Sequence, residues 1–290
     1  MKILVTGASG QLGSELKRAL HEVSQEISGI ETFFLDRKNL PLDQLILIQD
    51  ILGMYQPDII VHTAAYTAVD RAESDRQAAD TVNHLATAEI AQYCHIHGTK
   101  LIAISTDYVF DGESDQPLKE DAPTAPISVY GETKLWGEQA VQKWAPDSII
   151  IRTSWVYSSY GSNFVKTMLR LMNERTELSV VADQIGTPTY AHDLAQAIVQ
   201  IIQSPQWQPG IYHYSNEGEI SWYDFAVAIR DIAGLSCAVH PIPTTAYPTP
   251  AKRPRYSLLD KSKIKATFGV IVPNWRESLK HMLHASERGE

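Results

Sequence analysis

The feature that most constrains the fold is an alternation of short apolar runs with longer helical patterns over the first two-thirds of the chain. Five runs rich in β-branched residues are expected as strands: KILVTG, TFFLD, PDIIVHTA, TKLIAIST and DSIIIRTSWVY. They lack strict polar alternation, so both of their faces are expected to be buried. The pattern predicts an α/β fold with a doubly wound parallel sheet covered by helices on both faces.

The regularity declines beyond about Arg152, where proline and aromatic residues cluster. We therefore predict two parts. Residues 1–155, with part of 156–220, form the nucleotide-binding domain, and approximately 156–290 contribute a smaller α/β substrate-binding lobe that shares a cleft with it. Residues 111–128 form a long, polar, proline-rich connection. Long ordered loops of this kind are often functional, but a plain surface loop is an equal alternative.

Composition narrows the class of protein. The 290 residues are 44% hydrophobic and carry a net charge of −9, which argues against nucleic acid or an anionic membrane surface as the main partner. Two cysteines give no disulfide framework and suit a reducing compartment, so a cytoplasmic location is expected. The N-terminal apolar run is too short for a signal segment or a membrane span.

A glycine-rich turn follows the first expected strand. LVTGASGQLGSEL places Gly7, Gly10 and Gly13 three residues apart, at the start of the first expected helix. Such a turn brings backbone N–H groups and a helix N-terminus against a phosphate, and side chains would block that approach. In this strand, turn and helix context the motif predicts a Rossmann dinucleotide site.

The second expected strand ends in Asp36, which Arg37 and Lys38 follow at once. A carboxylate here would hydrogen-bond the adenosine ribose of NAD, whereas an adjacent cation accommodates the 2′-phosphate of NADP. The alternative for this triplet is a solvated turn. We expect NADPH to be preferred, with NADH accepted.

Tyr130 and Lys134 lie four residues apart in VYGETK, on one face of an expected helix. A neighbouring ammonium lowers the pKa of a phenol, which is ordinarily about 10, and thereby makes it useful for proton transfer. Thr106 ends the fourth expected strand, at the sheet edge where ligands collect, and its hydroxyl would bind a substrate oxygen beside the tyrosine. By themselves, Tyr130 and Lys134 would be an ordinary exposed pair.

Together these residues resemble the extended short-chain dehydrogenase/reductase superfamily. The blocks HTAAYTAVDRAE, STDYVFDG, VYGETKLWGE, DQIGTPTYAHDLA and AYPTPAKRPRYSLLD are more closely similar to the dTDP-4-dehydrorhamnose reductase family, in the same order along nearly the whole chain. The resemblance implies reduction of the C4 ketone of dTDP-4-dehydro-L-rhamnose by NAD(P)H. It also implies a dTDP-sugar substrate and allows a homodimer.

The resemblance assigns roles residue by residue. Tyr130 would protonate the C4 oxygen, Lys134 would lower the pKa of that tyrosine and hold the ribose, and Thr106 would orient the carbonyl. Arg253 would bind the diphosphate of the substrate, for which a planar guanidinium is suited. The remaining implied contacts are Gly7, Gly10, Gln11, Leu12 and Gly13 on the pyrophosphate, Asp36 and Arg37 at the adenosine ribose, Ala65, Tyr66 and Thr67 along the cofactor, and Thr106, Asp107 and Trp155 at the deoxysugar.

The sequence departs from the family pattern at two places. Pro41 and Leu42 stand where an acidic residue is usual beside the adenine, with Asp43 displaced, and His62 replaces a frequent asparagine. These changes concern the adenine side of the cofactor, not the reacting centre.

Two alternatives stay open. Thr106-Asp107-Tyr108 lacks the second carboxylate of nucleotide-sugar dehydratases, but an epimerase with a retained cofactor needs only the tyrosine. The second alternative is a non-catalytic binding subunit with the same fold. No residue pattern indicates a metal site. Mg²⁺ at a dimer contact, as described for related reductases, cannot be placed from the sequence.

Overall fold

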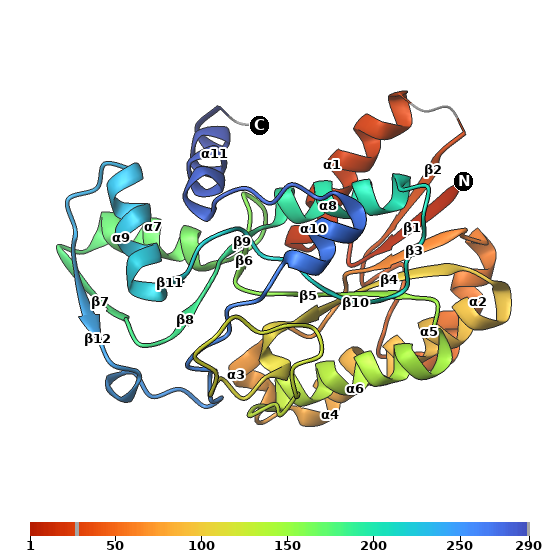
Figure 1. The fold of residues 1–290 in the computed structure, drawn as a ribbon, viewed down its shortest axis with the longest axis horizontal. Helices are drawn as coiled ribbons and strands as arrows, with labels where there is room; N and C mark the ends of the chain where they lie inside the picture. The colour runs from red at the N-terminus through yellow and green to blue at the C-terminus, as the bar shows by residue number, and fades with distance from the viewer. Residues whose placement is uncertain (27–28, 289–290) are drawn as a thin grey trace.

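A computed structural model describes residues 1–26 and 29–288 of the chain. Within these residues six strands form one parallel sheet in the order β10-β5-β4-β3-β1-β2 (Figure 1). The strands are β1 Lys2–Thr6, β2 Glu31–Leu35, β3 Ile59–His62, β4 Lys100–Thr106, β5 Ile149–Thr153 and β10 Gly210–His213. The first five coincide with the apolar runs read from the sequence, and the predicted α/β fold class is confirmed.

Helices cover both faces of this sheet (Figure 1). One face carries α1 Gln11–Glu26, α8 Ala191–Gln203 and α10 Ser262–Phe268, and the other carries α2 Leu45–Tyr55, α5 Ala86–His97 and α6 Val129–Trp144. Residues of β1, β3, β4 and β5 contribute to the apolar core on each face, which explains their lack of polar alternation.

The order of the strands places a switch point beside β1. The chain leaves β1 for β2 on one side and then returns to β3 on the other, and each pair is parallel. In open α/β sheets the crevice for ligands lies outside the carboxyl ends of the strands at such a point. Three short helical segments follow β3 and lead into α5: α3 Val69–Ala72, α4 Arg76–Asp80 and the π-helical turn η1 Thr81–Leu85.

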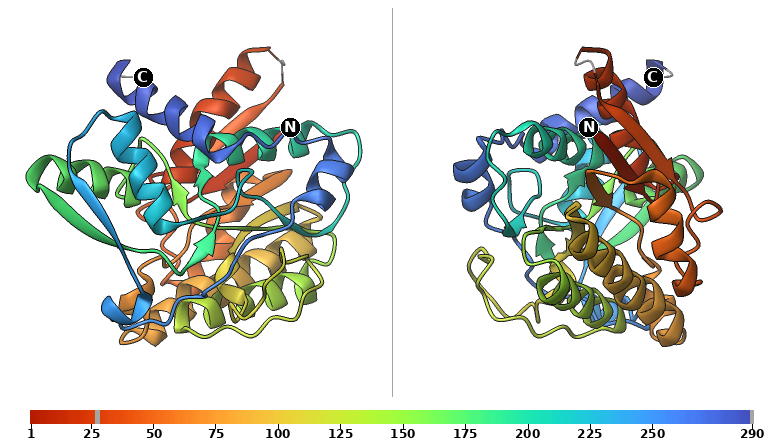
Figure 2. Two further views of the ribbon diagram at one scale, coloured as in Figure 1. Left: turned by 60° about the vertical axis from the view of Figure 1, so that its left-hand side comes forward. Right: turned by 90° about the vertical axis from the view of Figure 1, so that its right-hand side faces the viewer.

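A smaller lobe lies at one end of the sheet and has an apolar core of its own (Figure 2). Its elements are α7 Phe164–Glu174, β7 Glu177–Val181, α9 Trp222–Ile232, β12 Ala238–Ile242 and α11 Trp275–Arg288, with β7 and β12 paired in parallel. Two short strand pairs adjoin it, β6 Val156–Tyr157 with β9 Thr189–Tyr190, and β8 Ile185–Gly186 with β11 Ile220–Ser221. The chain therefore leaves the lobe for α8 and β10 in the main sheet and then returns to it.

The connection over residues 111–128 follows the turn η2 Asp107–Val109 and packs against a late segment of the chain, just after the turn η3 Thr244–Ala246. The Leu118 N–H donates to the Leu258 carbonyl at 2.8 Å, and the Tyr256 N–H donates to the Gly112 carbonyl at 3.1 Å. This connection is thus an ordered contact between the main domain and the segment that leads out of the lobe. In the described ranges, no helix is both long and apolar enough to cross a membrane.

Candidate active site

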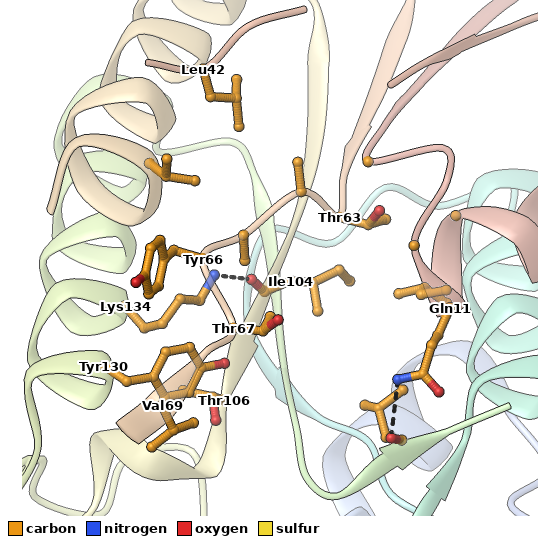
Figure 3. Close-up of a pocket in the computed structure, with 18 of the residues that line it drawn as sticks. Gln11, Leu42, Thr63, Tyr66, Thr67, Val69, Ile104, Thr106, Tyr130 and Lys134 are labelled. Carbon is orange, nitrogen blue, oxygen red and sulfur yellow. Dashed lines mark hydrogen bonds between the residues drawn. The ribbon is translucent and has the colours of Figure 1, made fainter. Parts of the chain in front are cut away.

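A cleft of about 1070 Å³ opens at the carboxyl ends of β1, β3 and β4 (Figure 3). That volume is at the upper end of the range for ligand sites and suits two ligands side by side. Its lining contains the glycine turn, the residues after β2 and β3, the end of β4, and one face of α6. In Figure 3, Gln11, which follows the glycine turn at Gly10, lies across the cleft from Tyr130 and Lys134.

The glycine turn is built so that no side chain fits inside it. Gly7 has a φ of +70°, and a Cβ added there would lie 2.7 Å from the Ala64 backbone nitrogen. A Cβ on Gly13 would lie 2.2 Å from the Gly7 carbonyl oxygen. The first turn of α1, which begins at Gln11, contains no acidic residue. A bare backbone at a helix N-terminus fits the phosphates of a dinucleotide.

Asp36 and Arg37 reach the cleft from the end of β2. One carboxylate oxygen of Asp36 accepts from the backbone N–H groups of Lys38 and Asn39, at 2.9 and 3.1 Å, which forms a tight turn. The Arg37 side chain is 87% exposed and lies 3.5 Å from the Asp43 carboxylate. Asp36 and Arg37 therefore both line the cleft, and their contact with an adenosine ribose stays a prediction.

The loop after β3, which carries Ala65, Tyr66 and Thr67, is fixed by a buried amide that the sequence did not single out. Asn83 of η1 accepts from the Tyr66 N–H at 2.8 Å and donates to the Tyr66 carbonyl at 3.2 Å. It also donates to the Thr133 hydroxyl of α6. This side chain joins three elements of the site, and only its tertiary partners reveal it.

Thr106, Tyr130 and Lys134 meet in the cleft, as the sequence predicts (Figure 3). The Ser128 hydroxyl caps α6 by accepting from the Gly131 N–H, which sets Tyr130 in the first turn. The Lys134 ammonium, one turn later, donates to the Ile104 carbonyl at 2.7 Å. Thr106 ends β4, and its hydroxyl donates to Asp107 at 3.0 Å.

The ionisation of these groups follows from burial. Desolvation raises the pKa of Tyr130 to about 12, against a lowering hydrogen bond from Thr106, and the Asp107 charge raises it further. Desolvation lowers the pKa of Lys134 to about 8, and the Glu138 carboxylate opposes that change. At neutral pH the site therefore holds a protonated phenol beside a protonated amine.

Asp107 and Trp155 line the same cleft near these groups. Asp107 is 1% exposed, and desolvation raises the pKa of its carboxyl to about 6, although hydrogen bonds from Ser257 and Thr106 lower it. Trp155 has a left-handed backbone with φ of +47°, and its ring stacks on Trp222 at 3.7 Å. The positive φ is unusual for a bulky residue and indicates that the surrounding packing holds the indole in place.

Arg253 is the one predicted site residue that the structure does not bring into the cleft lining, as far as the described residues define it. Its guanidinium forms a two-point ion pair with Asp70, with Nη–Oδ distances of 3.0 and 2.7 Å. Asp70 belongs to α3, so this pair ties the late segment of the chain to the loop after β3. Val69 and Arg71, on either side of Asp70, line the cleft, so the ion pair lies beside it.

His62, the departure noted in the sequence, is a packed structural residue. Its two ring nitrogens lie 2.8 Å from the Thr6 hydroxyl and 3.2 Å from the Thr87 hydroxyl. Burial lowers the pKa of its imidazole to about 3. Across residues 1–26 and 29–288, no cluster of three His, Cys, Asp or Glu side chains is arranged to hold a metal ion.

The chain is similar in sequence and in structure to known proteins. The sequence model described as the RmlD substrate binding domain matches residues 1–288. The chain belongs to this family. It is 43% identical over 282 residues to the spore coat polysaccharide biosynthesis protein SpsK of Bacillus subtilis, covering 97% of this chain and 96% of that protein.

A second relative is the dTDP-4-dehydrorhamnose reductase of Aggregatibacter actinomycetemcomitans. It is 41% identical over 291 residues, covering 97% of this chain and 98% of that protein. The dTDP-4-dehydrorhamnose reductase of Bacillus anthracis, solved in complex with NADP, matches with a TM-score of 0.92 at 38% identity. That match covers 98% of this chain and 99% of the solved one. The resemblance read from the sequence is thus confirmed, and the chain is a member of an oxidoreductase family.

Proposed function

We propose that this protein reduces the C4 ketone of dTDP-4-dehydro-L-rhamnose to dTDP-L-rhamnose with NADPH. The observation that carries the proposal is the pairing of Tyr130 with Thr106 at the end of β4, in one cleft with the glycine turn. Full-length relatives named for this reductase activity, and one solved with NADP, support both the substrate and the cofactor.

The residues of the chain supply the proton and the orientation. When bound, NADPH supplies the hydride that adds to C4. With that hydride on C4, the C=O π electrons move to the oxygen, which takes the phenolic proton of Tyr130; ketone, hydride and proton together give the alcohol, and the tyrosine is left as phenolate. Thr106 holds the same oxygen, and the Lys134 ammonium lowers the energy of the phenolate through its charge. Solvent then returns a proton to the tyrosine.

The cofactor would be held by three parts of the cleft. Gly7, Gly10 and Gly13 leave space for the pyrophosphate against the backbone of α1, and Gln11 and Leu12 would lie along it. Asp36 would accept from the adenosine ribose, while the exposed Arg37 guanidinium would contact a 2′-phosphate. Ala65, Tyr66 and Thr67 would pass along the remainder of the cofactor.

The sugar would lie beside Thr106, Asp107 and Trp155. Asp107 is a buried acceptor for a sugar hydroxyl, and the half-buried Trp155 ring offers an apolar face to a deoxysugar. Arg253 would bind the diphosphate. Because its guanidinium already pairs with Asp70, diphosphate binding at this residue requires that it share or replace that contact.

An assay of NADPH consumption with dTDP-4-dehydro-L-rhamnose, run beside a UDP-linked 4-keto sugar, tests this function. We expect the dTDP-sugar to be reduced faster, and NMR of the product to show the L-rhamno configuration. Tightly bound NAD after purification, with interconversion of sugars and no net reduction, would instead indicate an epimerase. Cofactor binding with no turnover of either sugar would indicate a non-catalytic subunit.

A further inference from the structure

A buried ion pair lies behind the proposed catalytic lysine. Glu138 follows Lys134 by one turn of α6 and is 3% exposed, while Arg152 of β5 is 2% exposed. The guanidinium donates to both carboxylate oxygens, with Nε–Oε1 at 2.9 Å and Nη2–Oε2 at 2.7 Å. Removing two charges from water is costly, and a buried ion pair is weak evidence for stability alone. A role in the site would account for its place.

The same carboxylate joins α6 to β4. The Ser105 hydroxyl donates to Glu138 Oε1 at 2.5 Å, and the carbonyl of the preceding residue, Ile104, accepts from Lys134 at 2.7 Å. Thr106 is the next residue of β4. Two side chains of α6, one turn apart, therefore fix the end of β4 that carries the predicted substrate contact. Arg152 of β5 holds the Glu138 side chain in place.

The charge of Glu138 also acts on Lys134. Desolvation lowers the pKa of Lys134, and the carboxylate raises it again, which leaves it near 8. Asp107, which follows β4 and lines the cleft, is another carboxylate in this region; its charge acts on the pKa of Tyr130, whereas Glu138 is the carboxylate that acts on the pKa of Lys134. His62 of β3 is neutral because burial lowers its pKa to about 3, and Tyr130 of α6 is neutral because burial raises its pKa to about 12. The guanidinium of Arg152 on β5 is a positive charge that Glu138 pairs with.

We propose that Glu138 is a positioning residue, which keeps Lys134 charged and holds the proton-donating helix in register with β4. The inference rests on the proposed function in one respect, namely that a charged Lys134 serves the reaction. The electrostatic part concerns the chain alone and is measurable without substrate.

Glu138→Gln keeps the size of the side chain and removes its charge. We expect the pKa of Lys134, measured in the ligand-free protein by competitive acetylation and mass spectrometry, to fall by about one unit or more. A carboxylate favours the charged amine, so its loss lets Lys134 deprotonate at lower pH. The alkaline limb of the pH profile of kcat should move down by the same amount.

Glu132→Gln is the matched control. Glu132 lies on the same helix and pairs with Arg76 at 2.8 Å on the surface, so its replacement should leave both measurements unchanged. Glu138→Asp, with the charge kept on a shorter side chain, should retain a higher Lys134 pKa than Glu138→Gln. If Glu138 acted only through the shape of its side chain, Glu138→Gln, which keeps the length, would stay closer to the parent in Lys134 pKa than Glu138→Asp.

Glu138→Gln leaves Arg152 buried without its partner, which can prevent folding. The double variant E138Q/R152M removes both charges and should fold, again with a lowered Lys134 pKa. An unchanged Lys134 pKa in either folded variant overturns the inference. Failure of the parent protein to reduce any keto sugar would contradict the proposed function instead, and the acetylation experiment would still decide the role of Glu138.

Discussion

Desolvation, more than any neighbouring charge, sets the state of the Tyr130 hydroxyl. Its pKa is raised to about 12, and the groups that modify it are Thr106 and Asp107. The Lys134 ammonium is instead hydrogen-bonded to the Ile104 carbonyl. A phenol that keeps its proton at neutral pH suits a donor in ketone reduction. The predicted lowering of the Tyr130 pKa by Lys134 stays a prediction.

Lys134→Met should weaken both cofactor binding and turnover. A lost charge-assisted hydrogen bond of about 1.5–3 kcal/mol corresponds to a rise in the NADPH Kd of roughly tenfold or more. Loss of the ammonium beside the phenolate should lower kcat by about 10²-fold. Fluorescence titration with NADPH and initial-rate measurements check the two effects. Lys143→Met, an exposed change on the same helix, is the control, and equal behaviour of both variants would show that Lys134 has no role.

Arg253→Lys tests the proposed diphosphate contact. A lysine keeps the charge but loses the planar two-point geometry, so we expect the KM for the dTDP-sugar to rise about tenfold with kcat little changed. Steady-state kinetics against Arg255→Lys, an exposed neighbour, provide the comparison. A KM that matches the parent would place the diphosphate elsewhere and leave the Asp70–Arg253 pair as a structural link.

The motif residues of the site were predictable because each is adjacent in sequence to the element that positions it. Gly7 directly follows β1, Gly13 lies in the first turn of α1, and Tyr130 and Lys134 share one helical face. Asn83 and Glu138 were not predictable in the same way. Their partners, Tyr66 and Arg152, lie 17 and 14 residues away, on other elements, and only the packed fold brings them together.

At the scale of elements, the close approach of α6 to the end of β4 depends on a glycine. A Cβ on Gly131 would lie 2.1 Å from the Tyr108 carbonyl oxygen. Gly131→Ala must therefore displace the helix that carries Tyr130. We expect a loss of activity of at least about tenfold, and a loss of stability of about 1–3 kcal/mol from overpacking, measured by urea unfolding.

Gly53→Ala supplies the contrast. Gly53 lies within α2, and an added Cβ there meets nothing within 4 Å. Alanine favours a helix over glycine by about 0.5–1 kcal/mol, so this variant should be as stable as the parent or slightly more so, with normal activity. Similar destabilisation in both variants would contradict the explanation from the close contact at Gly131.

One strand of the main sheet was hard to assign from the sequence. β10 is only Gly210–His213, lies between proline-rich and aromatic residues, and pairs with β5 at one edge of the sheet. Its local pattern gives no sign of a partner 61 residues earlier, because the pairing of Gly210 with Ile149 depends on how the chain returns from the lobe. The five earlier strands were easier to predict because helical patterns separate them at regular intervals in the sequence.

At the scale of the whole molecule, the smaller lobe is assembled from separate stretches of the chain. Its core includes Val165 of α7, Phe225 of α9 and Leu279 of α11, whereas α8 and β10 between them belong to the sheet. The sequence predicts a change near Arg152 and assigns part of residues 156–220 to the main domain, but its local patterns do not show which segments return to the sheet. The predicted domain limits and a homodimer stay predictions.

Two buried histidines should make the fold sensitive to acid. Burial lowers the pKa values of His62 and His213 to about 3 in the folded protein, against an ordinary value of 6.5. Below pH 6.5 the unfolded state therefore binds more protons than the folded state, and the free energy of unfolding decreases as the pH is lowered. Asp107 acts in the opposite sense, because its raised pKa of about 6 makes the folded state take up a proton first. Two groups against one predict a net loss between pH 6.5 and 5.

His62→Asn isolates one of these contributions. The free energy of unfolding of the parent should fall more than that of the variant between pH 7 and 5, by about 2 kcal/mol, since each pKa unit is worth about 1.4 kcal/mol. Urea unfolding at the two pH values measures it, with His95→Asn, at an exposed position, as the control. Equal pH dependence in the parent and His62→Asn would show that His62 is not held neutral.

The central claim is that the cleft is the active site of a reductase in which Tyr130 donates the proton. Tyr130→Phe, compared with the parent in NADPH titrations and in turnover of dTDP-4-dehydro-L-rhamnose, tests it most directly. We predict an NADPH Kd within about threefold of the parent, because only one hydroxyl is removed, and a kcat lower by about 10²–10⁴-fold. A phenylalanine variant that turns over the sugar at a near-normal rate would contradict the account.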